Sequence, residues 1–231
     1  MKNLYTEHKN PDLSHLREID NPTIGLDFDG VLSSTREHFL NEIENMYNVK
    51  INRELHMGSN PVIPQIGKSF GTLIEEIVNH NTDIYSSIPP IKGCSEATNR
   101  LKEYYKIKII THRVHDDWLD NEKLNEVKNL SINWLIDNDI YFDEFVCPTP
   151  ENKSEIPANV YIDDRKGNID NVLNKQKNNV GILYLRPHNI TDFPWNAWLA
   201  SSEKQLDIKY VANNDVTQWK IISDSLINCL D

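Results

Sequence analysis

Two aspartates two residues apart, Asp27 and Asp29, stand where a short apolar segment ends, just before Gly30. The segment begins at Thr23 and is typical of a buried strand that leads into a polar loop. If both carboxylates point into one crevice, they repel each other and attract a hard cation such as Mg²⁺. One could attack phosphorus, and the other could protonate the leaving oxygen and later deprotonate a water. By itself the pair is more often an acidic turn, in which the glycine simply allows a sharp bend.

Two other segments that are expected to be strands also end in residues suited to phosphate chemistry. Thr111 ends the segment KIKIIT, and its hydroxyl could donate a hydrogen bond to a phosphoryl oxygen. The segment NVYID ends in Asp163 and Asp164, followed by Arg165. Two adjacent acids after a buried strand are costly unless a positive group, such as a metal ion, lies beside them. The ordinary alternatives are a threonine that caps a loop and an exposed acidic turn.

Lys153 lies in the loop before the segment NVYID. Its ammonium could neutralise phosphate charge and keep Asp27 ionised, although a lone lysine is usually a solvated surface residue. Each of these signals alone favours its ordinary explanation. Their combination does not, because each lies at or beside the carboxyl end of a different expected strand and each supplies a missing part of one reaction.

The hydrophobic pattern predicts alternating strands and helices. Strands are expected at 23–28, 106–111, 142–147, 159–163 and 180–185, and helices at 95–105, at 116–138 and from 215 onward. This alternation implies an α/β fold with a central parallel sheet covered on both faces. Ligands bind such sheets at the carboxyl ends of the strands, where the polar residues lie.

The chain divides into three expected regions. Residues 1–20 are polar and are expected to form an arm with one short helix. Residues 34–88 combine helical spacing with a Gly/Pro-rich stretch and are expected to form a small, mostly helical insert. The α/β core then consists of residues 21–33 and 89–231.

Composition limits the functional classes. The chain has 231 residues, with 24 basic and 35 acidic residues and a net charge of -11. Such a protein repels phosphate backbones, so long nucleic acid is an unlikely partner. The three cysteines are isolated and are expected to be buried or half-buried thiols in a reducing compartment. With no apolar N-terminal stretch and no run of membrane-spanning length, we expect a soluble, cytoplasmic protein.

The set of Asp27, Asp29, Thr111, Lys153 and Asp163-Asp164 resembles the four motifs of the haloacid dehalogenase superfamily, over roughly residues 23 to 185. The resemblance implies a Rossmann-like core with the helical insert as a cap. Asp27 would be the nucleophile and a Mg²⁺ ligand, and Asp29 the general acid/base, with its carbonyl on the metal. Thr111 and Lys153 would hold the phosphoryl group. Asp163 would complete the metal site, with Asp164 as a further ligand through water or in the next shell. An aspartate at position 29 favours phosphatases over dehalogenases.

A closer resemblance is to the 5'(3')-deoxyribonucleotidases, which share a short helical cap in this position. It rests on the turn Pro90-Ile91-Lys92-Gly93, the lysine-to-aspartate spacing, the ending Ile162-Asp163-Asp164-Arg165, the tail Arg186-Pro187-His188-Asn189 and the later Trp219. It implies a phosphomonoesterase that acts on nucleoside monophosphates. His112 and Arg113 depart from the residues expected after Thr111 in those enzymes, and with Gly30 they are candidates for contact with the substrate.

Two alternatives stay open on the sequence. An arginine two residues after the motif hydroxyl, here Arg113, and an Asp-Asp-Arg ending also occur in polynucleotide 3'-phosphatases, which process nucleic-acid ends. The other alternative is a catalytically silent module that binds a phosphorylated ligand or a partner protein. Against it, every catalytic position carries a residue type that the reaction needs. A homodimer is compatible with the sequence, which does not specify the oligomeric state.

Overall fold

The structure is a computed structural model. It describes residues 13–52, 60–113, 121–176, 179–184, 186, 189, 199–201, 204–206 and 215–230. Several segments with sequence-based predictions therefore lie outside the described residues: 1–12 of the expected arm, 53–59 of the expected insert, 116–120 of the expected helix 116–138, residue 185, and Pro187 and His188 of the tail.

Helices and strands alternate along most of the described chain. The strands are β1 (Thr23–Leu26), β2 (Val62–Ile63), β3 (Lys68–Ser69), β4 (Lys106–Ile110), β5 (Glu144–Val146), β6 (Val160–Asp163), β7 (Val180–Leu183), β8 (Leu199–Ser201) and β9 (Lys204–Leu206). The α-helices are α1 (Thr35–Tyr47), α2 (Phe70–His80), α3 (Cys94–Leu101), α4 (Asn121–Asp137), α5 (Lys166–Lys175) and α6 (Asp215–Asn228). Short 3-10 helices are η1 (Ser14–Glu18), η2 (Thr82–Ser87) and η3 (Pro150–Glu155).

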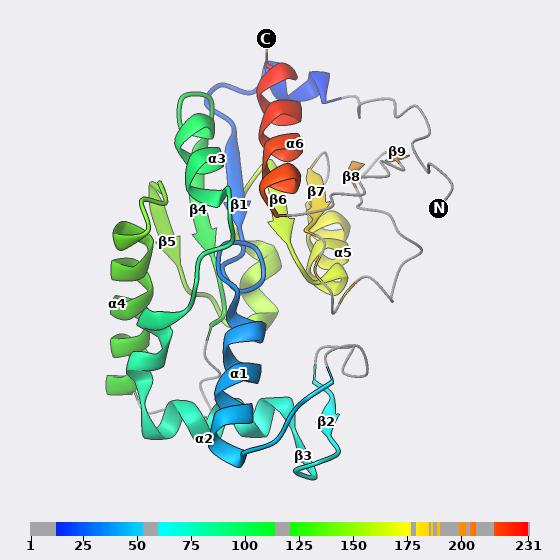
Figure 1. The fold of residues 1–231 in the computed structure, drawn as a ribbon. Coiled ribbons are helices and arrows are strands. Elements are labelled where there is room, and N and C mark those ends of the chain that lie inside the picture. Colours follow the sequence, from blue (N-terminus) through cyan, green and yellow to red (C-terminus); the bar gives the residue numbers. More distant parts are fainter. Residues whose placement is uncertain are drawn as a thin grey trace.

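The predicted α/β fold with a central parallel sheet is confirmed. The sheet has the strand order β5-β4-β1-β6-β7-β8-β9, in which β5, β4, β1, β6 and β7 pair in parallel and β8 and β9 add antiparallel strands. In the central strand β1, Leu26 pairs with Ile109 of β4 on one side and Ile162 of β6 on the other. The loops that follow β1, β4 and β6 therefore all leave the sheet at the carboxyl ends of its strands (Figure 1).

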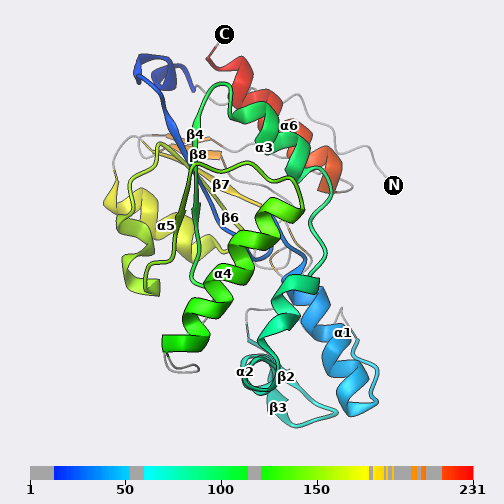
Figure 2. The ribbon, with the colours of Figure 1, turned by 90° about the vertical axis from the view of Figure 1, so that its left-hand side faces the viewer.

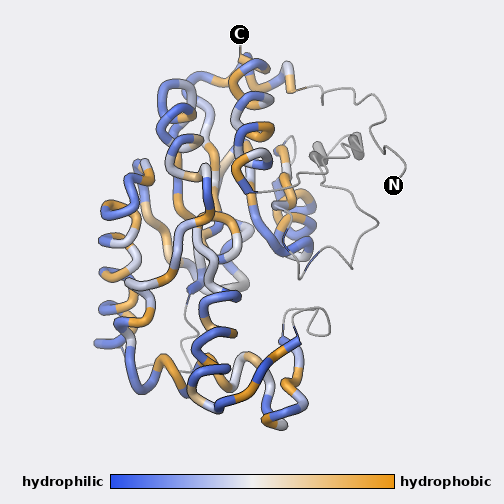
Figure 3. Tube along the Cα trace, in the orientation of Figure 1, coloured by the Kyte–Doolittle hydropathy of each residue, from blue (hydrophilic) through white to orange (hydrophobic). Residues whose placement is uncertain are grey.

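Successive residues of the central strands face opposite sides of the sheet. On one side, Ile24 and Leu26 join the largest hydrophobic cluster, which includes residues of α3, α4 and α6. On the other side, Gly25 leaves room for Ile110 and Tyr161, which belong to a smaller cluster beneath α5. Figure 2 shows α3 and α6 on one side of the sheet and α5 on the other. Hydrophobic residues run along the central strands, and the helices carry hydrophobic and hydrophilic residues alternately (Figure 3).

The insert lies beyond the carboxyl ends of the strands, below the sheet in Figure 1. It contains α1, α2 and η2, and the described part of its Gly/Pro-rich stretch forms the antiparallel hairpin β2–β3. Its buried side chains, among them Phe39 and Tyr85, form a second hydrophobic cluster, to which Val127 of α4 also belongs. The insert therefore has a core of its own and contacts the α/β core through α4.

The exposure of the three cysteines differs at one position from the sequence-based expectation. Cys94 is buried and Cys229 half-buried, but Cys147 is exposed, so the expectation of buried or half-buried thiols is wrong for Cys147. It follows β5, the strand at the edge of the sheet, where less of the protein covers it.

Leu13 and Leu16, within the expected arm, are buried in the main cluster. In the part of the chain that the structure describes, no helix has the length and apolarity needed to cross a membrane.

The packing of the last helix, α6, against the core can be tested by truncating one of its buried side chains. Leu226 is fully buried in the main cluster. We expect Leu226→Ala to lower the free energy of unfolding by about 2–5 kcal/mol, because the truncation leaves a cavity that the neighbours fill only partly. Val216 on the same helix is 46% exposed, so Val216→Ala should change stability by less than about 0.5 kcal/mol. Urea unfolding followed by circular dichroism measures both. If both variants lost the same small amount of unfolding free energy, α6 would not be packed as described.

Candidate active site

The strand ends of β1 and β6 bring two aspartates to one lysine. The Lys153 Nζ lies 2.8 Å from Asp27 Oδ1 and 2.7 Å from Asp163 Oδ2. All three side chains are at least nine-tenths buried, with exposed fractions of 9%, 9% and 2%. Buried charges need charged or hydrogen-bonding partners, and here a single ammonium serves two carboxylates. The structure therefore places three of the predicted site residues in direct contact.

Burial is the largest influence on the pKa of Asp27, and the neighbouring charges come after it. Burial raises the pKa of Asp27 to about 7, an effect that Lys153 opposes and that Asp163 and Asp164 strengthen. Burial would lower the pKa of Lys153, but Asp163 and Asp27 outweigh it and hold that pKa above its usual value. The lysine therefore stays charged, and the cluster carries more negative than positive charge.

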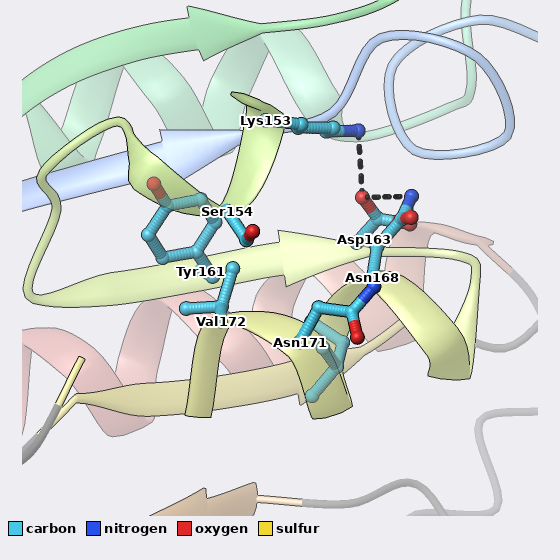
Figure 4. A pocket seen from close by; sticks show the side chains of 8 residues that line it. Lys153, Ser154, Tyr161, Asp163, Asn168, Asn171 and Val172 are labelled. Atoms are coloured by element: carbon cyan, nitrogen blue, oxygen red, sulfur yellow. Dashed lines mark hydrogen bonds and ion pairs between the residues drawn. The ribbon is translucent and has the colours of Figure 1, made fainter. Parts of the chain in front are cut away.

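Asp163 is held by further donors that the sequence motifs did not reveal. The backbone N–H of Arg165 donates to its Oδ1, and the Asn168 Nδ2 lies 3.1 and 3.0 Å from the two carboxylate oxygens. Figure 4 shows Asp163 between Lys153 and Asn168, above a small pocket that Tyr161 and Val172 also line. Asn168 sits in the first turn of α5, so the start of this helix orients the aspartate. The only sequence signal for it was its place shortly after the acidic pair.

Asp164 completes a group of three buried carboxylates. One oxygen each from Asp27, Asp163 and Asp164 lie within 4.8 Å of one another, which is close enough to bind one metal ion. Gly30 faces this group in a left-handed backbone conformation, with φ of +83°, and a Cβ at this position would overlap the Asp164 carboxylate. Both features favour a glycine at position 30, because another residue would strain the backbone and displace the Asp164 carboxylate. Asn189 supports the same loop, since its Nδ2 donates to the Asp164 carbonyl.

Asp29 is not a member of this group of three carboxylates, and it has its own partners. Its Oδ1 accepts a hydrogen bond from Thr35 Oγ1, lies 3.3 Å from Ser33 Oγ and lies 3.3 Å from Arg113 Nε. Ser33 and Thr35 were not predicted as site residues. Thr35 is the first residue of α1, so the insert reaches the strand-end loop directly.

The remaining predicted residues follow β4, the strand beside β1. Thr111 is buried, and its backbone N–H donates to the Val146 carbonyl. His112 Nδ1 lies 3.1 Å from the Pro148 carbonyl. Arg113 is 8% exposed and turned into the protein, towards Asp29. Sequence position alone made Arg113 a candidate for substrate contact, and its burial and ion pair instead give it a partner inside the protein.

A parallel sheet, a helical insert after its first strand and an acidic cluster at the carboxyl ends of its central strands are the features of the haloacid dehalogenase superfamily. Within it, the chain belongs to the family described as 5' nucleotidase, deoxy (pyrimidine), cytosolic type C protein, whose model matches residues 21–201. The protein is therefore a phosphoric monoester hydrolase, and this replaces the alternative of a catalytically silent module.

The chain is also similar to solved structures of haloacid dehalogenase-like hydrolases. One is from Streptococcus pneumoniae, with 14% identity, 74% of this chain and 97% of that chain covered, and a TM-score of 0.42. A second, from Xanthomonas campestris, has 14% identity, coverage of 90% and 97%, and a TM-score of 0.42. A third, from Geobacter sulfurreducens, has 14% identity, coverage of 75% and 99%, and a TM-score of 0.41. No protein with a curated description matches the sequence.

The tight approach of Gly30 to Asp164 gives a test of the site geometry. We expect Gly30→Ala to fold but to lose at least about tenfold in kcat on p-nitrophenyl phosphate, because the added methyl group displaces a site carboxylate. Gly167 in α5 offers a matched control, since a Cβ there meets nothing within 4 Å. Gly167→Ala should keep full activity. An active Gly30→Ala variant would contradict the described approach of the two loops.

Proposed function

We propose that this protein is a Mg²⁺-dependent phosphomonoesterase that hydrolyses (deoxy)nucleoside 5'-monophosphates through an aspartyl-phosphate on Asp27. The observation that carries the proposal is the buried arrangement of Asp27, Lys153 and Asp163 at the carboxyl ends of two adjacent parallel strands. A buried carboxylate beside a fixed cation is suited to covalent catalysis, because the cation keeps the nucleophile ionised and attracts the phosphate.

In the first step, a carboxylate oxygen of Asp27 forms a bond to phosphorus, and the bond from phosphorus to the 5' oxygen of the nucleoside breaks. Asp29 gives its proton to that oxygen, so the nucleoside leaves as a neutral alcohol. The Lys153 ammonium balances phosphoryl charge beside Asp27. The Thr111 hydroxyl and the backbone of its loop would donate hydrogen bonds to the phosphoryl oxygens.

In the second step, water attacks the phosphorus of the aspartyl-phosphate. Asp29, now a carboxylate, takes a proton from this water, and the bond between phosphorus and the Asp27 oxygen breaks. Inorganic phosphate leaves, and both aspartates return to their starting states. Asp29 thus acts as an acid in the first step and as a base in the second.

The acidic cluster fits a magnesium ion. Asp27, Asp163 and Asp164 supply three oxygen donors within 4.8 Å of one another, and Mg²⁺ prefers carboxylate oxygens together with water and phosphate. When bound, the ion would neutralise phosphate charge and lower the pKa of Asp27. The carboxylate of Asp29 is engaged with Thr35 and Arg113, so its proposed contribution to the metal is its backbone carbonyl.

The substrate class rests on the family and on charge. The family description names a cytosolic 5' nucleotidase of deoxy-pyrimidine type, and we propose the same substrate class and a cytoplasmic location for this chain. A net charge of -11 disfavours long nucleic acid. The polynucleotide 3'-phosphatase alternative drew on Arg113, and that side chain is buried against Asp29.

A panel of nucleoside 5'-monophosphates tests the reaction. The wild type should release phosphate from one or more deoxynucleoside 5'-monophosphates, and Asp27→Asn should be slower by at least about 10³-fold, because the amide is not a nucleophile. Asp170→Asn is the control, since its side chain is 46% exposed on α5. Equal phosphate release by the wild type and Asp27→Asn would contradict the proposal. Faster release from a 3'-phosphorylated oligonucleotide than from every mononucleotide would select the 3'-phosphatase instead.

Removal of metal tests the acidic cluster. Treatment with EDTA should abolish activity, and Mg²⁺ should restore it. Mg²⁺ should also raise the Tm of the EDTA-treated wild type, since a ligand that binds only the folded state stabilises it by about 2.7 kcal/mol at a hundred times its Kd. Asp163→Asn should lose this rise in Tm, whereas Asp170→Asn should keep it. Full activity in EDTA would contradict the metal assignment.

A further inference from the structure

Arg113 occupies an unusual place between the α/β core and the insert. Its guanidinium carbon lies 3.9 Å from the ring centroid of Phe28 and 4.7 Å from that of Tyr85. Phe28 belongs to the main hydrophobic cluster, and Tyr85, on η2, belongs to the cluster of the insert. The side chain of Arg113 is only 2% exposed. A guanidinium between two aromatic faces is stabilised by cation–π attraction, so this arginine joins the two parts of the molecule.

Hydrogen bonds and charge fix the orientation of the guanidinium. Its Nη1 donates to Ser131 Oγ of α4 at 3.1 Å, and its Nε lies 3.3 Å from Asp29 Oδ1. The Ser131 hydroxyl is itself held, since it donates to the Val127 carbonyl one turn earlier. The Tyr85 hydroxyl lies 3.5 Å from the Arg113 carbonyl. Side chain and backbone of Arg113 are therefore both restrained, and its Nε lies beside Asp29 Oδ1 as an ion-pair partner, without the geometry of a hydrogen bond.

The partners of Asp29 are distributed unequally over its two oxygens. Within the described part of the chain, Thr35, Ser33 and Arg113 all approach Oδ1. Ser33 Oγ also lies 2.7 Å from Thr35 Oγ1, which favours a chain of hydroxyls ending at Oδ1. The oxygen that exchanges a proton with substrate or water is expected to be the one that no donor among the described residues approaches, which is Oδ2.

We propose that Arg113 is a positioning residue that holds Asp29 Oδ1 and so leaves Oδ2 to transfer the proton, with the insert helping to set this position through Tyr85 and Thr35. The inference rests on the proposed function, in which Asp29 is the acid and base. It gives Arg113 a role distinct from substrate binding, since its buried guanidinium pairs with Asp29, donates to Ser131 through Nη1 and lies between two rings.

This role predicts a dependence on the leaving group. Nucleoside 5'-monophosphates release an alcohol whose oxygen needs a proton as the bond to phosphorus breaks. p-Nitrophenyl phosphate releases a stable phenolate that needs none. Misplacing Asp29 should therefore slow the phosphorylation of Asp27 by a nucleotide and spare its phosphorylation by p-nitrophenyl phosphate. A residue that binds the phosphoryl group would affect both substrates equally.

The experiment measures the first turnover of each substrate by rapid quench, following nucleoside or p-nitrophenol release. Arg113→Met keeps an unbranched apolar side chain between the two rings, and Arg113→Lys keeps the charge but not the planar guanidinium that lies between them. We expect Arg113→Met to lose at least about tenfold with the nucleotide, within the range that general acids contribute, and to stay within about threefold of the wild type with p-nitrophenyl phosphate. Arg113→Lys should lose less of the nucleotide rate than Arg113→Met, and Asp29→Asn should lose more. Both should again stay close to the wild type with p-nitrophenyl phosphate.

Arg100 provides the matched control, because it also pairs with a serine and an aspartate, Ser223 and Asp224, but on the faces of α3 and α6 away from the site. Arg100→Met should leave both first-turnover rates unchanged. Equal losses with both substrates in the two Arg113 variants, or no loss with either, would overturn the inference. If the wild type releases no nucleoside, or if Asp27→Asn releases it equally fast, the proposed function itself fails, a result separate from any selectivity of Arg113.

Discussion

The ammonium group of Lys153, buried between the carboxylates of Asp27 and Asp163, is the interaction on which the rest of the site depends. Removal of one member of a buried ion pair leaves an uncompensated charge, at a cost of about 3–5 kcal/mol. Yet a single lysine does not balance three buried carboxylates, and the pKa of Asp27 is raised, first by burial and then by the neighbouring carboxylates. The same excess of negative charge that is unfavourable for the isolated chain is what makes the cluster suited to a divalent cation.

The sheet creates this cluster by its topology. β1 lies between β4 and β6, and all three run in parallel. The loops that follow these strands therefore meet at the carboxyl ends of the sheet. Asp27 follows β1, and Asp163 is the last residue of β6. The insert contributes the contacts of Asp29. Thr35 donates a hydrogen bond to it, and Tyr85 packs against Arg113, which pairs with it. The nucleophile thus depends on the core alone, whereas the proposed acid and base depends on contacts between core and insert.

Much of this arrangement could be predicted from the sequence, because strand ends in a parallel sheet converge whatever the details of packing. The apolar segments before Asp27, Thr111 and Asp163 fixed the fold class, and the family match confirms the superfamily to which these motifs pointed. The contact of Lys153 with Asp27 was expected from the motif set, whereas its contact with Asp163 was not.

Other features depend on tertiary packing and could not be predicted. Asn168 orients Asp163 only because α5 begins directly below the strand end. The direction of Arg113 is set by Phe28 and Tyr85, which are far apart in the sequence. The exposure of Cys147 depends on β5 being the edge strand, an order that hydrophobic periodicity does not specify.

The central claim is that Asp27 itself becomes phosphorylated, and it can be tested by acid quench of the Mg²⁺-loaded enzyme during turnover of a nucleotide that it hydrolyses. Peptide mapping by mass spectrometry, after borohydride reduction of the acyl-phosphate, should place a reduced side chain at residue 27 in the wild type and nowhere in Asp27→Asn. Turnover of the nucleotide with no modification at residue 27, or with modification at another aspartate, would contradict the account.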